Sequence, residues 1–139
     1  GVGALVARRL QADDAQGVRV VEHTGEAADL LERLSGVDTA YLIDAAVTGA
    51  LPGSITRFDA AATPLAGSAF ACSTHGLGLL EAIELARALG RLPRRCVVYA
   101  IEGRQYEVGH RLSPQVAAAA EEVATLIRQE LRSRHAERS

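Results

Sequence analysis

Two side chains stand out as candidates for chemistry, the carboxylate of Asp44 and the imidazole of His75. Asp44 interrupts an apolar run that extends from Tyr41 to Val47. Burial of an unpaired carboxylate in such a run would cost several kcal/mol. We therefore expect Asp44 either to accept hydrogen bonds from backbone N–H groups, or to act as a metal ligand or a general base.

His75 lies just before a predicted helix that begins near Leu77. The positive end of a helix dipole disfavours imidazolium, so the ring should be neutral and able to bind a metal ion or accept a proton. A structural role is the alternative for a single histidine. Cys72 and Ser73 are too close to His75 in the chain for the ring to activate either of them, and we do not expect a nucleophile–base pair.

Other candidate positions are weaker. The Gly1–Gly3 segment has incomplete spacing for a dinucleotide-binding loop. The segment 23–26 either contributes to a site at the end of a strand or simply starts a helix, with Thr24 as its N-cap. Glu102 and Tyr106 follow the last predicted strand, where they could touch a substrate or only cap the loop.

The elements that must position these residues alternate between strand and helix. Apolar periodicity predicts an amphipathic opening helix, then strands at 17–22, 39–47 and 96–101. It also predicts helices at 26–34, at 77–89 (stopped by Gly90 and Pro93) and after Ser113-Pro114, with an Arg-rich tail beyond Arg132 that frays. Segment 54–58 alternates apolar with polar residues, as expected of an antiparallel edge strand.

This order predicts an α/β fold with three layers, a mainly parallel twisted sheet with helices on both faces and one antiparallel edge strand. Sites in such folds lie beyond the carboxyl ends of the strands. That rule selects Asp44 and the loops after Glu22, Cys72 and Ile101. Right-handed crossovers further predict a strand before the opening helix, and the absence of Met indicates that translation began upstream of Gly1.

Composition narrows the functional classes. The 139 residues suit one domain, and we expect a single domain over 1–139. A net charge of −2 and 4% aromatic residues do not favour nucleic acid as a partner. The sequence lacks the long apolar run of a membrane span, and its two cysteines do not form a disulfide framework. We therefore expect a cytoplasmic protein that does not bind a membrane.

Several segments, taken in order, resemble those of the NiFe-hydrogenase maturation proteases. They are Gly1–Gly3 with the helix that follows, Thr24-Gly25 with Leu30-Leu31, Ile43-Asp44-Ala45 followed by Pro52-Gly53, Ser73–Leu77, and Gly109–Val116. Their order and spacing along the whole chain are more specific than any one of them. One departure is His23, which stands where the family more often has Gly.

The resemblance implies an aspartic-type or metal-dependent endopeptidase that removes a C-terminal extension from the nickel-loaded precursor of a NiFe-hydrogenase large subunit. It places Asp44 and His75 in the catalytic and metal-recognition site, and a third acidic residue immediately before Gly1. Nickel would be recognised in the substrate, with no tightly bound cofactor, and we expect a monomer. The alternatives are a non-catalytic, nickel-dependent binding module or assembly chaperone on the same fold, and a chain that is inactive without its first strand.

Overall fold

The computed structural model of the chain describes Val6 and residues 18–22, 27–46, 48–62, 79–103 and 113–138. Within these ranges the elements follow one another as β1 (Val18–Glu22), α2 (Ala27–Leu34), β2 (Thr39–Ala46), β3 (Ile55–Asp59), α3 (Leu79–Ala88), β4 (Arg95–Glu102) and α4 (Pro114–Arg138). Strands and helices therefore alternate as the apolar periodicity predicts, except that β2 is followed directly by the predicted edge strand β3. No helix in the described ranges is both long and apolar enough to cross a membrane.

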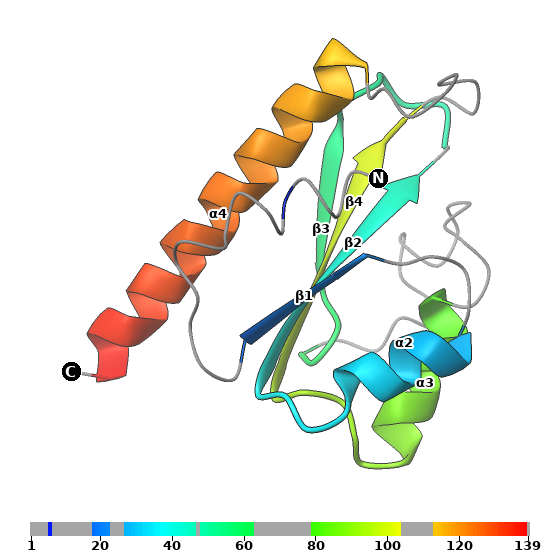
Figure 1. Cartoon of the computed structure of the whole chain (residues 1–139), viewed down its shortest axis with the longest axis vertical. Helices are drawn as coiled ribbons and strands as arrows, with labels where there is room; N and C mark the ends of the chain where they lie inside the picture. Colours follow the sequence, from blue (N-terminus) through cyan, green and yellow to red (C-terminus); the bar gives the residue numbers. More distant parts are fainter. Residues whose placement is uncertain are drawn as a thin grey trace.

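The strands form one sheet in the order β1-β2-β4-β3. β2 pairs in parallel with both β1 and β4, whereas β3 runs antiparallel to β4 at the edge (Figure 1). The carboxyl ends of β2 and β4 consequently meet at the same edge of the sheet. The prediction of a mainly parallel sheet with one antiparallel edge strand is confirmed.

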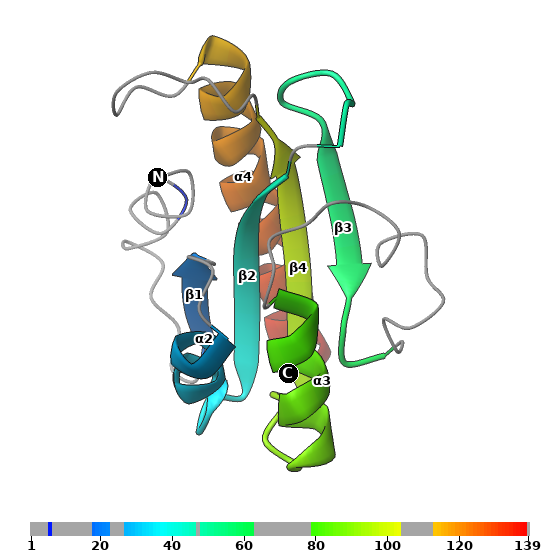
Figure 2. The same cartoon turned by 90° about the vertical axis from the view of Figure 1, so that its right-hand side faces the viewer.

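Helices cover both faces of the sheet. Figure 2 shows α2 and α3 in front of the strands and α4 behind them. Successive residues of a strand point to opposite faces, so Leu42 and Ala46 join the core under α2 and α3, while Tyr41 and Ile43 join the core under α4. Val6 is helical and fully buried in the α4-side core, in agreement with an amphipathic opening helix. The three predicted layers are thus present.

The last helix begins as predicted but ends later. Ser113 Oγ accepts a hydrogen bond from the Val116 N–H at 3.2 Å, which is the N-cap geometry expected before Pro114. The prediction of fraying after Arg132 was wrong, because the helix continues to Arg138. Arg134 anchors this last part of the helix by donating a 2.6 Å hydrogen bond to Thr39 Oγ1 at the start of β2.

Candidate active site

Asp44 lies near the carboxyl end of β2, opposite Ala100 of the central neighbour β4. Its two neighbours on the same side of the strand, Leu42 and Ala46, both pack under α2 and α3, so Asp44 projects toward that face. Only 2% of its surface is exposed. The structure thus places a buried carboxylate at the edge of the sheet where α/β folds bind their ligands.

A second buried acid, Glu102, ends β4 at the same edge, opposite Ala46 and 5% exposed. Both of its carboxylate oxygens are occupied by Thr48. Glu102 Oε1 accepts the Thr48 hydroxyl at 2.6 Å, and the Thr48 N–H donates to Oε2 at 2.9 Å and to Oε1 at 3.1 Å. Of the two roles considered for Glu102, the structure supports loop capping. Tyr106 lies outside the described residues.

The segment that leaves β2 turns tightly into β3. Leu51-Pro52-Gly53 forms a turn, because the N–H of Ser54 donates to the Leu51 carbonyl at 3.0 Å and its hydroxyl donates to the same oxygen at 2.6 Å. The Gly53 N–H donates to the Glu102 carbonyl at 2.8 Å. Gly53 has φ +88°, a conformation that favours glycine. The edge beside Asp44 is therefore well ordered by hydrogen bonds.

His75 lies outside the described residues, as do Cys72, Ser73, and the Thr24-Gly25 loop with His23. The pairing of Asp44 with His75 in one pocket stays a prediction. Within the described ranges, no group of three or more His, Cys, Asp or Glu side chains is placed to hold a metal ion.

Cys96 does not provide a nucleophile. Its side chain is fully buried at the amino end of β4, in the core under α2 and α3. Burial raises the pKa of the thiol from 9.0 to about 12, and the negative charge of Asp59 adds to the increase. Since the thiolate is the nucleophilic form, Cys96 is inert near neutral pH. The other cysteine, Cys72, is not described.

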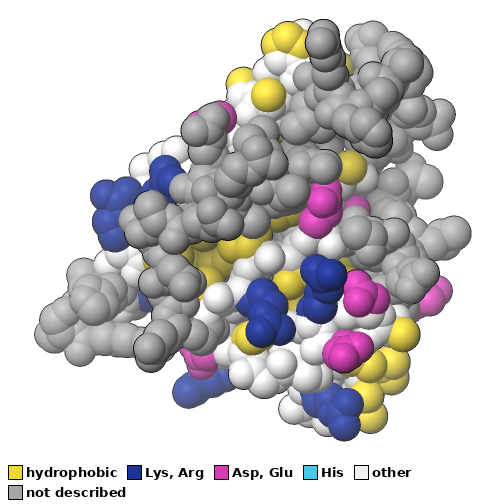
Figure 3. Space-filling model, in the orientation of Figure 1, with side chains coloured by type: hydrophobic (Ala, Val, Ile, Leu, Met, Phe, Trp, Pro, Cys, Tyr) yellow, Lys and Arg dark blue, Asp and Glu magenta, His cyan; other side chains and the backbone are white. Residues whose placement is uncertain are grey.

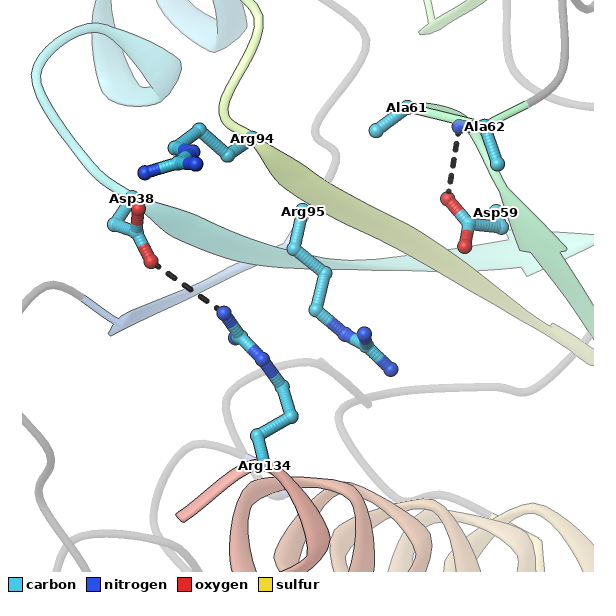
Figure 4. A pocket seen from close by; sticks show the side chains of 7 residues that line it. All are labelled: Asp38, Asp59, Ala61, Ala62, Arg94, Arg95 and Arg134. Carbon is cyan, nitrogen blue, oxygen red and sulfur yellow. Dashed lines mark hydrogen bonds and ion pairs between the residues drawn. The ribbon is translucent and has the colours of Figure 1, made fainter. Parts of the chain in front are cut away.

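A charged pocket lies at the opposite, amino-terminal edge of the sheet. Figure 4 shows the side chains around this cavity of about 540 Å³, in which Arg134 pairs with Asp38 at 3.6 Å and Asp59 Oδ1 accepts the Ala62 N–H at 3.1 Å. Thr39 to Asp44 spans about 17 Å of strand, so this pocket is remote from Asp44. Its lining residues are Asp38, Asp59, Ala61, Ala62, Arg94, Arg95 and Arg134.

A groove lies between β3 and α4. The sequence patterns predicted neither this groove nor the charged pocket. One of the residues that line the groove is Glu130 of α4, whose Oε1 accepts hydrogen bonds from Arg57 Nε at 2.7 Å and from the Tyr99 hydroxyl at 3.0 Å. The Tyr99 ring stacks against Tyr41, with 6.4 Å between the ring centroids. These residues come from segments far apart in the sequence, and only their spacing on one helix face and one strand face could have indicated that they meet.

The described surface carries charges of both signs. Figure 3 shows basic and acidic side chains interspersed on the face drawn there, without a continuous basic area among the described residues. Apolar side chains gather beside α3 in the same view. Leu85 in the last turn of this helix and Leu89 just beyond its end are 47% and 52% exposed.

The molecule thus belongs to the class of three-layer α/β proteins, and it carries a buried carboxylate at the carboxyl edge of its sheet. The family model described as hydrogenase maturation protease (HycI) matches residues 4–130. The chain therefore belongs to the hydrogenase maturation protease family and is a peptidase of hydrogenase maturation.

Solved structures show the same fold. Hydrogenase maturating endopeptidase HybD from E. coli superposes with a TM-score of 0.64 at 22% identity, over 95% of this chain and 85% of that one. The [NiFe] hydrogenase maturation protease HycI from Thermococcus kodakarensis KOD1 gives a TM-score of 0.63 at 24% identity, over 94% and 82%. An endopeptidase from Escherichia coli gives 0.68 at 20% identity, over 95% and 85%. No curated protein sequence matches the chain.

Proposed function

We propose that this protease removes a C-terminal extension from the nickel-loaded precursor of a NiFe-hydrogenase large subunit. The observation that carries the proposal is the burial of Asp44 at the carboxyl end of β2 in a member of the hydrogenase maturation protease family. A carboxylate in this position lies at the carboxyl edge, the usual binding edge of parallel sheets, where we expect the substrate to approach.

We further propose that His75 completes the site with Asp44. His75 precedes Leu79, the first residue of α3, by four positions, and four residues span at most about 14 Å. Leu79 is fully buried in the core that contains Ala46 and Ala100, which are neighbours of Asp44 along β2 and across the sheet. Because α3 packs on the face toward which Asp44 projects, a connection of four residues would hold His75 on that same side of the sheet.

The two side chains suit an ion that arrives with the substrate. A carboxylate oxygen and an imidazole nitrogen form a mixed donor set for a borderline divalent ion, and substrate groups would fill the remaining positions. Nickel seated in the precursor is such an ion, so no tightly bound cofactor is needed. Nickel could then polarise the scissile carbonyl or lower the pKa of an attacking water. Asp44 would hold the ion or accept the proton of that water.

The test uses the product of the complete gene and a nickel-loaded precursor, with the precursor mass as the readout. We expect the wild-type enzyme to shorten the precursor by its extension, and Asp44→Asn and His75→Ala to reduce the rate at least about 100-fold. Asp29→Asn is the matched acid control, since Asp29 is 43% exposed and pairs with Arg33 on the surface of α2. His135→Ala is the histidine control. Undiminished processing by Asp44→Asn would refute the assignment.

The same measurement separates the protease from a binding module. A complex with the precursor that forms without a change in mass would support a nickel-dependent assembly chaperone. Precursor without nickel should remain intact if nickel is part of the recognised substrate. We also propose that the enzyme works as a monomer in the cytoplasm, where a free thiol such as that of Cys96 is stable, and light scattering should then give the mass of one chain.

A further inference from the structure

The loop that joins β2 to β3 exposes an apolar side chain at its tip. Leu51 is 80% exposed, more than either other large hydrophobic residue that is exposed in the described ranges. A single exposed leucine is ordinary on protein surfaces. Leu51 differs because the loop that carries it, residues 48–53, is held at both ends by the same buried acid, Glu102.

At the start of the loop, the Glu102 carboxylate accepts both the hydroxyl and the N–H of Thr48, at distances from 2.6 to 3.1 Å. At its end, the Glu102 main chain accepts from the Gly53 N–H at 2.8 Å and donates to the Ser54 carbonyl at 2.8 Å. Hydrogen bonds to an ionised carboxylate are about twice as strong as neutral ones. Both ends of the loop are thus fixed to the last residue of β4.

A loop fixed in this way presents Leu51 in one position before any partner binds. Preorganisation raises affinity because less conformational entropy is lost on binding. The loop is also a convex tip, whereas sites for small molecules are concave. Its geometry therefore suits insertion of the leucine into an apolar depression on a folded protein.

The position of the loop identifies that protein. Thr48 follows Asp44 by four residues, and Glu102 lies on the strand next to Asp44, two residue pairs further toward the carboxyl edge. A macromolecule that brings a scissile bond to Asp44 must approach the edge from which the loop projects. Resting on the function proposed above, we propose that Leu51 docks on the body of the hydrogenase precursor, and that Glu102 is the positioning residue that holds the docking loop.

The first test measures the kinetics of precursor processing by Leu51→Ser in the complete enzyme. Loss of an anchoring side chain should raise KM about tenfold while kcat stays within about twofold, because the loop contacts the precursor away from the scissile bond. Leu89→Ser is the matched control. Leu89 is also exposed, at 52%, but it follows the carboxyl end of α3 and is not part of the loop between β2 and β3. It should leave KM and kcat unchanged.

The second test concerns the positioning role of Glu102. Glu102→Gln should raise KM as Leu51→Ser does and should accelerate hydrogen exchange at the Thr48 amide. The double variant, Leu51→Ser with Glu102→Gln, should then show a KM close to that of either single variant, since Leu51 contributes little to precursor binding once the loop is no longer held in place. If Glu102→Gln fails to fold, Thr48→Val removes one of the donors and tests the same coupling.

The outcomes distinguish this inference from the proposed function. Absence of processing by the wild-type enzyme would refute the proposed function itself. Normal processing with an unchanged KM in Leu51→Ser would refute only the docking loop. A kcat effect without a KM effect, or a change of oligomeric state on Leu51→Ser, would also overturn it, the latter because the leucine would then contact a second copy of the chain. Additive KM changes in the double variant would overturn the positioning role of Glu102.

Discussion

Alkaline pH should destabilise the folded protein through the buried tyrosines Tyr41 and Tyr99, which are 0% and 1% exposed. Burial raises the pKa of each phenol from 10.0 to about 12, and the nearby Glu130 carboxylate contributes to both shifts. In the unfolded chain the same groups should ionise near 10. Between these two pH values the unfolded state binds fewer protons than the folded state, so the free energy of unfolding falls as pH rises.

The magnitude follows from the size of the shift. Two pKa units at about 1.4 kcal/mol each give about 3 kcal/mol for one tyrosine, fully present below pH 10 and lost as pH rises through about 12. The two phenols share Glu130, so their combined effect should be smaller than the sum. Because the total stability of a domain is about 5–15 kcal/mol, a loss of this size is easily measured.

The composition makes the measurement selective. The chain contains no lysine, and all 15 of its Lys and Arg residues are Arg, which stays charged in this range. Few groups besides tyrosines and cysteines therefore titrate between pH 9 and 12. Cys96 should also lower the stability at alkaline pH, since its pKa is raised to about 12 as well. Because Cys96 is present in the wild type and in both tyrosine variants, its contribution is the same in all three proteins.

The assay compares urea unfolding of the wild type, Tyr41→Phe and Tyr99→Phe at pH 8 and pH 11. Each substitution should reduce the stability lost between these pH values, and absorbance at alkaline pH should lose one late phenol titration. At pH 8 Tyr99→Phe should cost about 1 kcal/mol, because its hydroxyl donates to Glu130 at 3.0 Å. Tyr41→Phe should be neutral or stabilising there, since among the described residues no group meets hydrogen-bond geometry with its buried hydroxyl. An alkaline loss identical in all three proteins would refute the reasoning.

Two further predictions concern the residues that fix the loops and the last helix. Gly53→Ala should cost at least about 2 kcal/mol of stability, because φ is +88° and a Cβ would lie 2.7 Å from a backbone oxygen in α4. Gly49→Ala, where φ is +91° but the space around a Cβ is open, should cost about 1 kcal/mol. Equal losses of stability in thermal unfolding would contradict this prediction. Arg134→Ala should reduce the free energy of unfolding in urea by about 1 kcal/mol, because it removes the donor to the buried Thr39 hydroxyl. Arg132→Ala, at an exposed position, is the control and should change this free energy by less than about 0.5 kcal/mol.

The main features of the fold could be predicted from local patterns. Runs of apolar residues identified the buried strands, the alternation at 54–58 identified the edge strand β3, and Ser113-Pro114 identified the start of α4. These signals work because burial and capping depend on the chemistry of nearby residues along the chain. Asp44 was selected as a candidate for the same reason, since a carboxylate within an apolar strand is conspicuous in the sequence alone.

The site and its supports depended on contacts that no local pattern encodes. Glu102 meets Thr48 across 54 residues, and Arg134 meets Thr39 across 95, because β4 inserts between β2 and β3 and α4 returns along the whole sheet. The sequence by itself determined which segments are strands, which are helices, and which side chains could do chemistry. Strand order, register and the direction of α4 decided which of those side chains meet, since long-range pairing is set by the packing of the whole core and not by the periodicity of any one segment.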